Sequence, residues 1–112
     1  MRRTLRYRFK SLPQNDTLRT TFIGGKVLMT HSIASLPAET RASILERVRT
    51  FDAFTKDNDP YGQHDFGSLK IAGEMILWKI DYYDEDCVYG SSDPADPSKT
   101  TRVLTIMFAC EY

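Results

Sequence analysis

The clearest pattern of hydrophobic positions along the chain is helical. Between residues 37 and 54 the apolar side chains recur every three or four positions, with charged side chains between them; they are Ile44, Leu45, Val48, Phe51 and Phe54. This spacing places the apolar side chains on one face of a helix. Pro37 suits a first helical turn, and Glu39 adds negative charge near the amide end. The pattern therefore predicts a helix over residues 37–54.

A shorter helix is predicted near the start of the chain. Asn15 or Asp16, just after Pro13, can cap the free amides of a helix that runs to about Phe22. The glycine pair at 24–25 then ends it.

The remaining apolar positions follow strand patterns, over 26–30, 66–72, 74–83 and 102–109. The strands 66–72 and 74–83 meet at Gly73, which predicts a hairpin. The last strand is apolar on both faces, so we expect it to be central and covered. The chain is therefore predicted to form an α+β fold. It would have a small antiparallel sheet of about four strands, with the main helix and the short N-terminal helix packed on one face.

Composition agrees with one compact domain. The chain has 112 residues, 41% of them hydrophobic, which we divide into a basic arm over 1–11, expected to be flexible, and a single α+β domain over 12–112. No apolar run approaches the ~18 residues of a membrane span, and no secretory signal follows Met1. Two cysteines are too few for a disulfide scaffold. We therefore expect a cytoplasmic protein with no membrane contact.

The net charge of zero conceals a division along the chain. Residues 1–50 carry ten basic and three acidic residues, a net +7, whereas residues 51–112 carry five basic and twelve acidic residues, a net −7. Either the fold keeps a basic face apart from an acidic one, or the halves interleave and their fields cancel.

The basic arm alternates cations with aromatic residues, a pattern suited to lying on nucleic acid. The candidate contacts are Arg2, Arg3, Arg6, Arg8 and Lys10. The same pattern also fits a frayed terminus or an edge strand.

The polar loop over residues 55–67 holds the first group of candidate ligands: Asp57, Asp59, His64 and Asp65. The beginning resembles a calcium loop, but Tyr61 and Ser68 stand where oxygen ligands are required. His64 with Asp65 and other acids can instead hold a transition metal or magnesium, or act as a base with its orienting carboxylate. The alternative is that these side chains only cap turns.

A second loop follows the strand 74–83 and is acidic. It adds Asp81, Asp84, Asp93 and Asp96, beside Glu85 and Asp86. These residues suit turns, but an acidic string can also imitate the phosphates of nucleic acid. If both loops lie at one edge of the sheet, their eight named aspartate and histidine side chains would converge on one candidate ligand or interaction site.

Familiar catalytic and cofactor motifs are absent from the sequence. It contains no paired Cys-x-x-Cys clusters, no His-Glu-x-x-His, no phosphate loop and no Gly-x-Ser-x-Gly elbow. We therefore assign no catalytic residue and no cofactor, and any metal is unknown beyond His64 and Asp65.

Several segments resemble a bacterial family catalogued as domain of unknown function 3768. They are Phe51 to Pro60, Gly62 to Gly67, Trp78 to Asp84, Gly90 to Pro97, Thr101 to Met107 and the terminal Glu111-Tyr112. The resemblance covers about residues 12–112 and brings no activity, cofactor or site residue with it. It implies a setting among small accessory proteins of plasmids, phages and genomic islands.

The leading functional hypothesis is a non-enzymatic interaction protein of a mobile genetic element. It would bind a host protein or nucleoprotein complex through its charged loops, for example as an anti-CRISPR-like inhibitor. One alternative is a metal-dependent hydrolase or nuclease that uses His64 and the loop carboxylates. The other is a nucleic-acid-binding accessory protein that uses the basic arm. The oligomeric state does not follow from the sequence.

Overall fold

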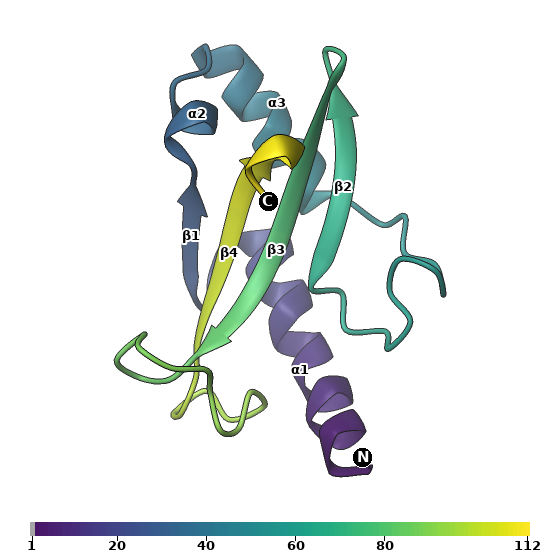
Figure 1. The fold of residues 1–112 in the computed structure, drawn as a ribbon, viewed down its shortest axis with the longest axis vertical. Helices are drawn as coiled ribbons and strands as arrows, with labels where there is room; N and C mark the ends of the chain where they lie inside the picture. Colours follow the sequence, from purple (N-terminus) through teal and green to yellow (C-terminus); the bar gives the residue numbers. More distant parts are fainter. Residues whose placement is uncertain (1) are drawn as a thin grey trace.

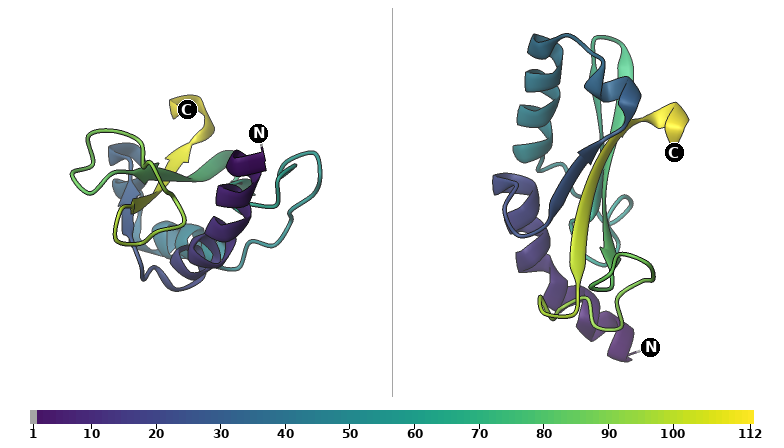
Figure 2. Two further views of the ribbon diagram at one scale, coloured as in Figure 1. Left: turned by 90° about the horizontal axis from the view of Figure 1, so that it is seen from below. Right: turned by 90° about the vertical axis from the view of Figure 1, so that its left-hand side faces the viewer.

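The computed structural model describes residues 2–112, with side chains described for residues 12–112. A four-stranded sheet has the strand order β1-β4-β3-β2. The strands are β1 (Lys26–Met29), β2 (Phe66–Ile71), β3 (Glu74–Tyr83) and β4 (Thr101–Phe108). The helices α1 (Arg2–Thr21) and α3 (Ala38–Arg49) cover one face of the sheet (Figures 1 and 2). The fold class is therefore α+β, as the sequence predicts.

The sheet is mixed, and the prediction of an antiparallel sheet is wrong for one strand. β3 pairs antiparallel with both β2 and β4, but β1 pairs parallel with β4, in the register Lys26 to Val103 and Met29 to Ile106. Parallel neighbours need a long connection instead of a tight turn. Two helices and a hairpin separate β1 from β4 along the chain, so β1 can enter the sheet in either direction.

The N-terminal helix is longer than predicted and starts earlier. α1 runs from Arg2 to Thr21 and contains Pro13, so Asn15 and Asp16 lie inside the helix and do not cap it. Asn15 is fully buried, as is Leu18 one turn later. The backbone of residues 2–11 belongs to α1, while the side chains of the predicted basic arm lie outside the described residues. Their flexibility stays a prediction.

The main helix begins where the sequence predicts and ends sooner. α3 ends at Arg49, and its buried residues are Ile44 and Val48. Phe51 and Phe54 lie beyond the helix, where both rings pack edge-on against Trp78 at centroid distances of 5.5 and 6.1 Å. Phe51 and Phe54 keep helical spacing in the sequence although they lie outside α3, because both side chains pack into the same core. A further helix, α2 (His31–Ala34), is too short for periodicity to predict it.

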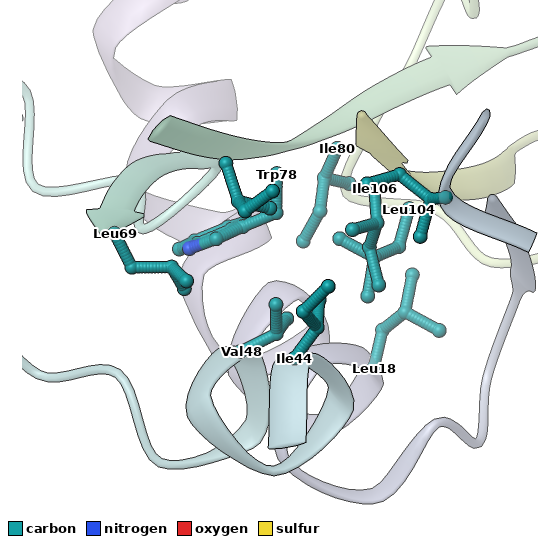
Figure 3. Close-up of a cluster of buried hydrophobic side chains, with 10 residues drawn as sticks. Leu18, Ile44, Val48, Leu69, Trp78, Ile80, Leu104 and Ile106 are labelled. Carbon is teal, nitrogen blue, oxygen red and sulfur yellow. The ribbon is translucent and has the colours of Figure 1, made fainter. Parts of the chain in front are cut away.

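The core lies between the two helices and the sheet (Figure 3). Leu18, Ile44 and Val48 face side chains of β2, β3 and β4 that alternate along each strand. The labelled members on the sheet are Leu69, Trp78, Ile80, Leu104 and Ile106. β4 is central, as predicted, and is flanked by β1 and β3. No helix in the part of the chain that the structure describes is long and apolar enough to cross a membrane.

Close packing requires a glycine at position 67, on the core side of β2. A Cβ atom at this position would clash with the indole nitrogen of Trp78, because the ring of Trp78 lies directly over the glycine backbone. The hairpin between β2 and β3 turns at Ala72 and Gly73, whose φ angles of 52° and 82° are those of a two-residue hairpin turn. The predicted hairpin is confirmed.

Candidate functional site

Both polar loops leave the sheet at the same end. The first loop, residues 50–65, leads into β2 at Phe66, which pairs with Lys79, and the second, residues 84–100, joins Tyr83 to Thr101. Figure 1 shows them at the lower end of the sheet, on either side of α1. The backbone amide of Ile80 donates to the carbonyl of Asp65 at 2.8 Å, which ties the first loop to β3.

His64 is held between two carboxylates. Its ring Nδ1 lies 2.9 Å from Asp16 Oδ1 on α1, and its Nε2 lies 3.6 Å from Asp59 Oδ2 in its own loop. The ring stacks on Phe54 at a centroid distance of 3.8 Å and an interplanar angle of 6°. The Asp59 carboxylate also accepts from the backbone amides of Gln63 and His64, at 3.0 and 3.2 Å. These contacts brace the loop against α1.

Asp16 connects this cluster to a buried arginine. Its Oδ1 also accepts from Arg19 Nη2 at 3.3 Å. Arg19 Nη1 donates to the carbonyls of Val48, Arg49 and Phe51, at 3.2, 3.2 and 2.8 Å. The last carbonyls of a helix have no partner within it, so Arg19 supplies the cap at the end of α3. A continuous set of polar contacts therefore runs from α3 through α1 to the first loop.

A second polar network lies beside the first and joins α1 to both loops. Asn15 Nδ2 donates to the Gln63 carbonyl at 3.0 Å and to Tyr82 Oη at 2.7 Å. Tyr82 Oη in turn donates to Asp65 Oδ2 at 3.1 Å, while Arg102 Nε donates to Asn15 Oδ1 at 3.1 Å. Burial, reinforced by the negative charge of Asp65, raises the pKa of Tyr82 above its usual range. The phenol is therefore held in its neutral, donating form.

In the first loop the structure brings together some of the predicted site residues. Asp59 and His64 contact each other, and Asp65 contacts Tyr82 next to them. Asp57 is exposed and belongs to neither network. Both nitrogens of His64 face carboxylates and one ring face is covered by Phe54, so the ring is held in place from three sides.

The acids of the second loop have separate local partners. Asp81, predicted with this loop, lies inside β3 and pairs with Lys79. In the loop itself, Asp84 Oδ1 accepts from the amide of Val88 at 3.0 Å. Asp96 Oδ1 accepts from the Ser98 hydroxyl and amide, which lowers the pKa of Asp96. Asp93 accepts from the Thr100 hydroxyl through its backbone carbonyl at 2.7 Å. Within residues 12–112, no three His, Cys, Asp or Glu side chains are grouped as a metal site.

The tip of the second loop exposes large apolar side chains. Val88 is 64% exposed and Tyr89 is 74% exposed, and only Cys87 separates them from the acidic run Asp84 to Asp86. The backbone amide of Asp84 donates to the Tyr89 carbonyl at 2.7 Å, and that of Cys87 donates to the Asp84 carbonyl at 3.0 Å. The loop tip is therefore closed by its own backbone and keeps these side chains facing outward.

Sequence reasoning missed the residues that join the two loops. The sequence predicts Asn15 and Asp16 as helix caps and assigns no role to Arg19, Tyr82 or Arg102. Their positions could have indicated this role. Arg102 and Tyr82 fall on the apolar face of predicted strands, where a buried polar side chain needs hydrogen-bond partners. The candidate contacts Arg2, Arg3, Arg6, Arg8 and Lys10 lie on α1, and their side chains are outside the described residues.

Comparison with known families gives one match. The family model described as "Protein of unknown function (DUF3768)" matches residues 29–111, which is more than half of the chain. The chain belongs to the DUF3768 family. No curated protein and no solved structure matches the chain.

The DUF3768 match is shorter than the 12–112 that the resemblance suggested. It contains both polar loops, β2, β3 and β4, but begins at Met29, after α1 and nearly all of β1. Asn15, Asp16 and Arg19 therefore lie outside the matched region, whereas their partners His64, Tyr82 and Arg102 lie inside it. The polar networks join the matched region to a helix that the family model does not include.

Proposed function

We propose that this DUF3768 protein is a small, non-enzymatic interaction protein that binds a protein partner through the second loop. The surface is the acidic tip, defined as Asp84, Glu85, Asp86, Val88 and Tyr89. The observation that carries the proposal is the outward exposure of Val88 and Tyr89 on a closed turn. Aromatic anchors surrounded by polar residues are a recurrent feature of protein interfaces.

The acidic tip is prepared for binding because little of it must become ordered. Its turn is closed by backbone hydrogen bonds, and Tyr83 forms a β-bridge with Gly90 at its base. A braced turn loses less conformational entropy on association than a free loop does. The three acids line a hollow of about 320 Å³ together with Ser92 and Lys99. The chemistry of this hollow suits a lysine or arginine side chain of a basic partner.

The family resemblance also suggests where the protein comes from and what kind of partner it binds. We infer a cytoplasmic protein of a mobile genetic element, carried by a plasmid or phage, that binds a host protein or nucleoprotein complex. An anti-defence role of the anti-CRISPR type is its most concrete version, since nucleic-acid-targeting complexes present basic surfaces. This setting rests on the family resemblance, and the acidic tip supports it through its charge.

The test is affinity capture from host lysate with matched variants. We expect the wild-type chain to capture a nuclease-resistant partner, and the double variant Val88→Ser/Tyr89→Ala to lose it. Tyr61→Ala is the matched control, since Tyr61 is an exposed tyrosine in the first loop. Glu85→Lys/Asp86→Lys should weaken capture in low salt. Equal capture by wild type and Val88→Ser/Tyr89→Ala, or no capture at all, would contradict the proposal.

A second candidate function is nucleic-acid binding through the start of α1. Its supporting observation is that α1 begins at Arg2 and extends past the loop end of the sheet (Figure 1), with five basic residues among its first nine positions. A helix of this composition would contact phosphates, and its affinity would fall steeply with salt. Partner capture that disappears after nuclease treatment would favour this candidate over the acidic tip.

A further inference from the structure

A pocket of about 350 Å³ lies between α1 and the end of the second loop, apart from the acidic tip. Its walls include Pro13, Gln14 and Thr17 of α1, Ile23 after the helix, and Pro97 and Arg102 on the other side. The volume is within the range of small-molecule sites, which are mostly apolar with a few placed polar groups. Two of its polar side chains lack a partner of one kind: Arg102 has no carboxylate in an ion pair, and Gln14 has an oxygen without a hydrogen bond.

Arg102 places a buried positive charge in this pocket. The residue is only 3% exposed. Its Nε donates to Asn15 Oδ1 at 3.1 Å, its Nη2 donates to the Pro94 carbonyl, and its guanidinium lies 5.4 Å from the centre of the Tyr82 ring. All three partners are neutral. Burial lowers the pKa of Arg102, but an arginine keeps its charge in proteins.

No carboxylate within residues 12–112 forms an ion pair with Arg102, and residues 1–11 contain no acid. The Asp65 carboxylate accepts from the hydroxyl of Tyr82 and forms no ion pair with Arg102. Asp93 precedes Pro94 and has a buried Oδ1 with no hydrogen-bond partner, yet it makes no ion pair with the guanidinium. A buried charge without a counter-charge is costly. The pocket is where a ligand can supply that counter-charge.

Gln14 lines the same pocket and has an acceptor atom without a partner. Its Nε2 donates to the Ala95 carbonyl at 3.2 Å, next to the Pro94 carbonyl that Arg102 uses. Its Oε1 is buried and has no hydrogen-bond partner. An acceptor left in this state requires a donor such as a hydroxyl group. Arg102 can therefore bind an anionic group, and Gln14 Oε1 can accept from a hydrogen-bond donor. One small molecule can carry both groups.

We propose that this pocket binds a small organic anion, with its phosphate or carboxylate group on Arg102 and a hydroxyl group donating to Gln14 Oε1. Pro13, Ile23 and Pro97 cover the carbon skeleton of the ligand. The site differs from the acidic tip in charge and position, so either proposal can fail without the other.

The test uses glycerol 3-phosphate as the probe, with glycerol and inorganic phosphate at matched ionic strength as comparisons. Amide chemical shifts measured by NMR should change saturably at residues 14–17, 23–24 and 97–102. Glycerol 3-phosphate should bind more tightly than inorganic phosphate, because only the former carries alcohol hydroxyl groups on a carbon skeleton that can reach Gln14 while the phosphate contacts Arg102. Glycerol alone should give no saturable change.

Gln14→Glu is the decisive variant, because it builds a counter-charge beside Arg102 without changing the side-chain size. It should weaken binding of glycerol 3-phosphate by about tenfold or more and raise the melting temperature of the free protein. Gln14→Leu should reduce the preference for glycerol 3-phosphate over inorganic phosphate. Asp93→Asn is the matched control and should leave binding at least as strong as in the wild type.

Two results would overturn the proposal. One is the absence of any saturable shift with either phosphate compound. The other is equal binding by the wild type and Gln14→Glu, which would show that the anions bind elsewhere.

Discussion

Asp16 Oδ1 lies 2.9 Å from His64 Nδ1, although the two residues are 48 positions apart in the chain. The same oxygen accepts from Arg19, which caps the end of α3. A single carboxylate thus connects the first polar loop, the N-terminal helix and the main helix.

Removing the Asp16–His64 contact should loosen the first loop without unfolding the domain. Asp16→Asn and His64→Gln should each lower the free energy of unfolding by about 0.5–1.5 kcal/mol, because the contact is partly exposed and screened by solvent. Chemical denaturation of both single variants and the double variant gives the coupling energy. Fully additive single effects would show that the two side chains do not interact in solution.

Replacing Arg19 should cost more than replacing a surface arginine. Arg19→Met removes the side-chain donor that the carbonyls of Val48, Arg49 and Phe51 share, and we expect a loss of about 2–4 kcal/mol in the free energy of unfolding. The matched control is Arg47→Met on the exposed side of α3, with an expected change within about 0.5 kcal/mol. Similar effects of the two substitutions would contradict the capping role.

Adding one methyl group at Gly67 should disturb the core. Gly67→Ala forces a Cβ atom against Trp78, so we expect a loss of about 1–3 kcal/mol and a changed tryptophan fluorescence maximum. Ser68→Ala, on the exposed neighbour, should change neither quantity. A Gly67→Ala protein with wild-type stability would mean that Trp78 does not lie over this position.

The buried phenol of Tyr82 should make the fold sensitive to alkali. Its pKa is raised in the folded protein, so the unfolded chain loses this proton first, as the pH passes the usual tyrosine value of about 10. The stabilising effect is complete below that pH and is lost as the pH rises toward the folded-state pKa. Denaturation at several alkaline pH values should show a smaller loss of stability for Tyr82→Phe than for the wild type. Parallel pH profiles would contradict the assignment.

Helices and strands could be predicted from the sequence where the spacing of apolar residues reflects one buried face. The main helix, the hairpin at Gly73 and the central position of β4 were all predicted, because period and apolar content report local burial. The extent of α1 and the end of α3 were not predicted. Phe51 and Phe54 keep helical spacing beyond the end of α3 because the core, and not the helix, positions them.

The candidate sites show the same division. The sequence by itself marked the polar loops and their aspartate and histidine residues, since such residues cluster where the chain turns. Only the tertiary structure joined His64 to Asp16, joined Asn15 to Tyr82 and Arg102, and turned β1 parallel to β4. These relationships depend on long-range packing. The partners lie dozens of residues apart, and no local preference in the chain encodes which buried polar group will satisfy another.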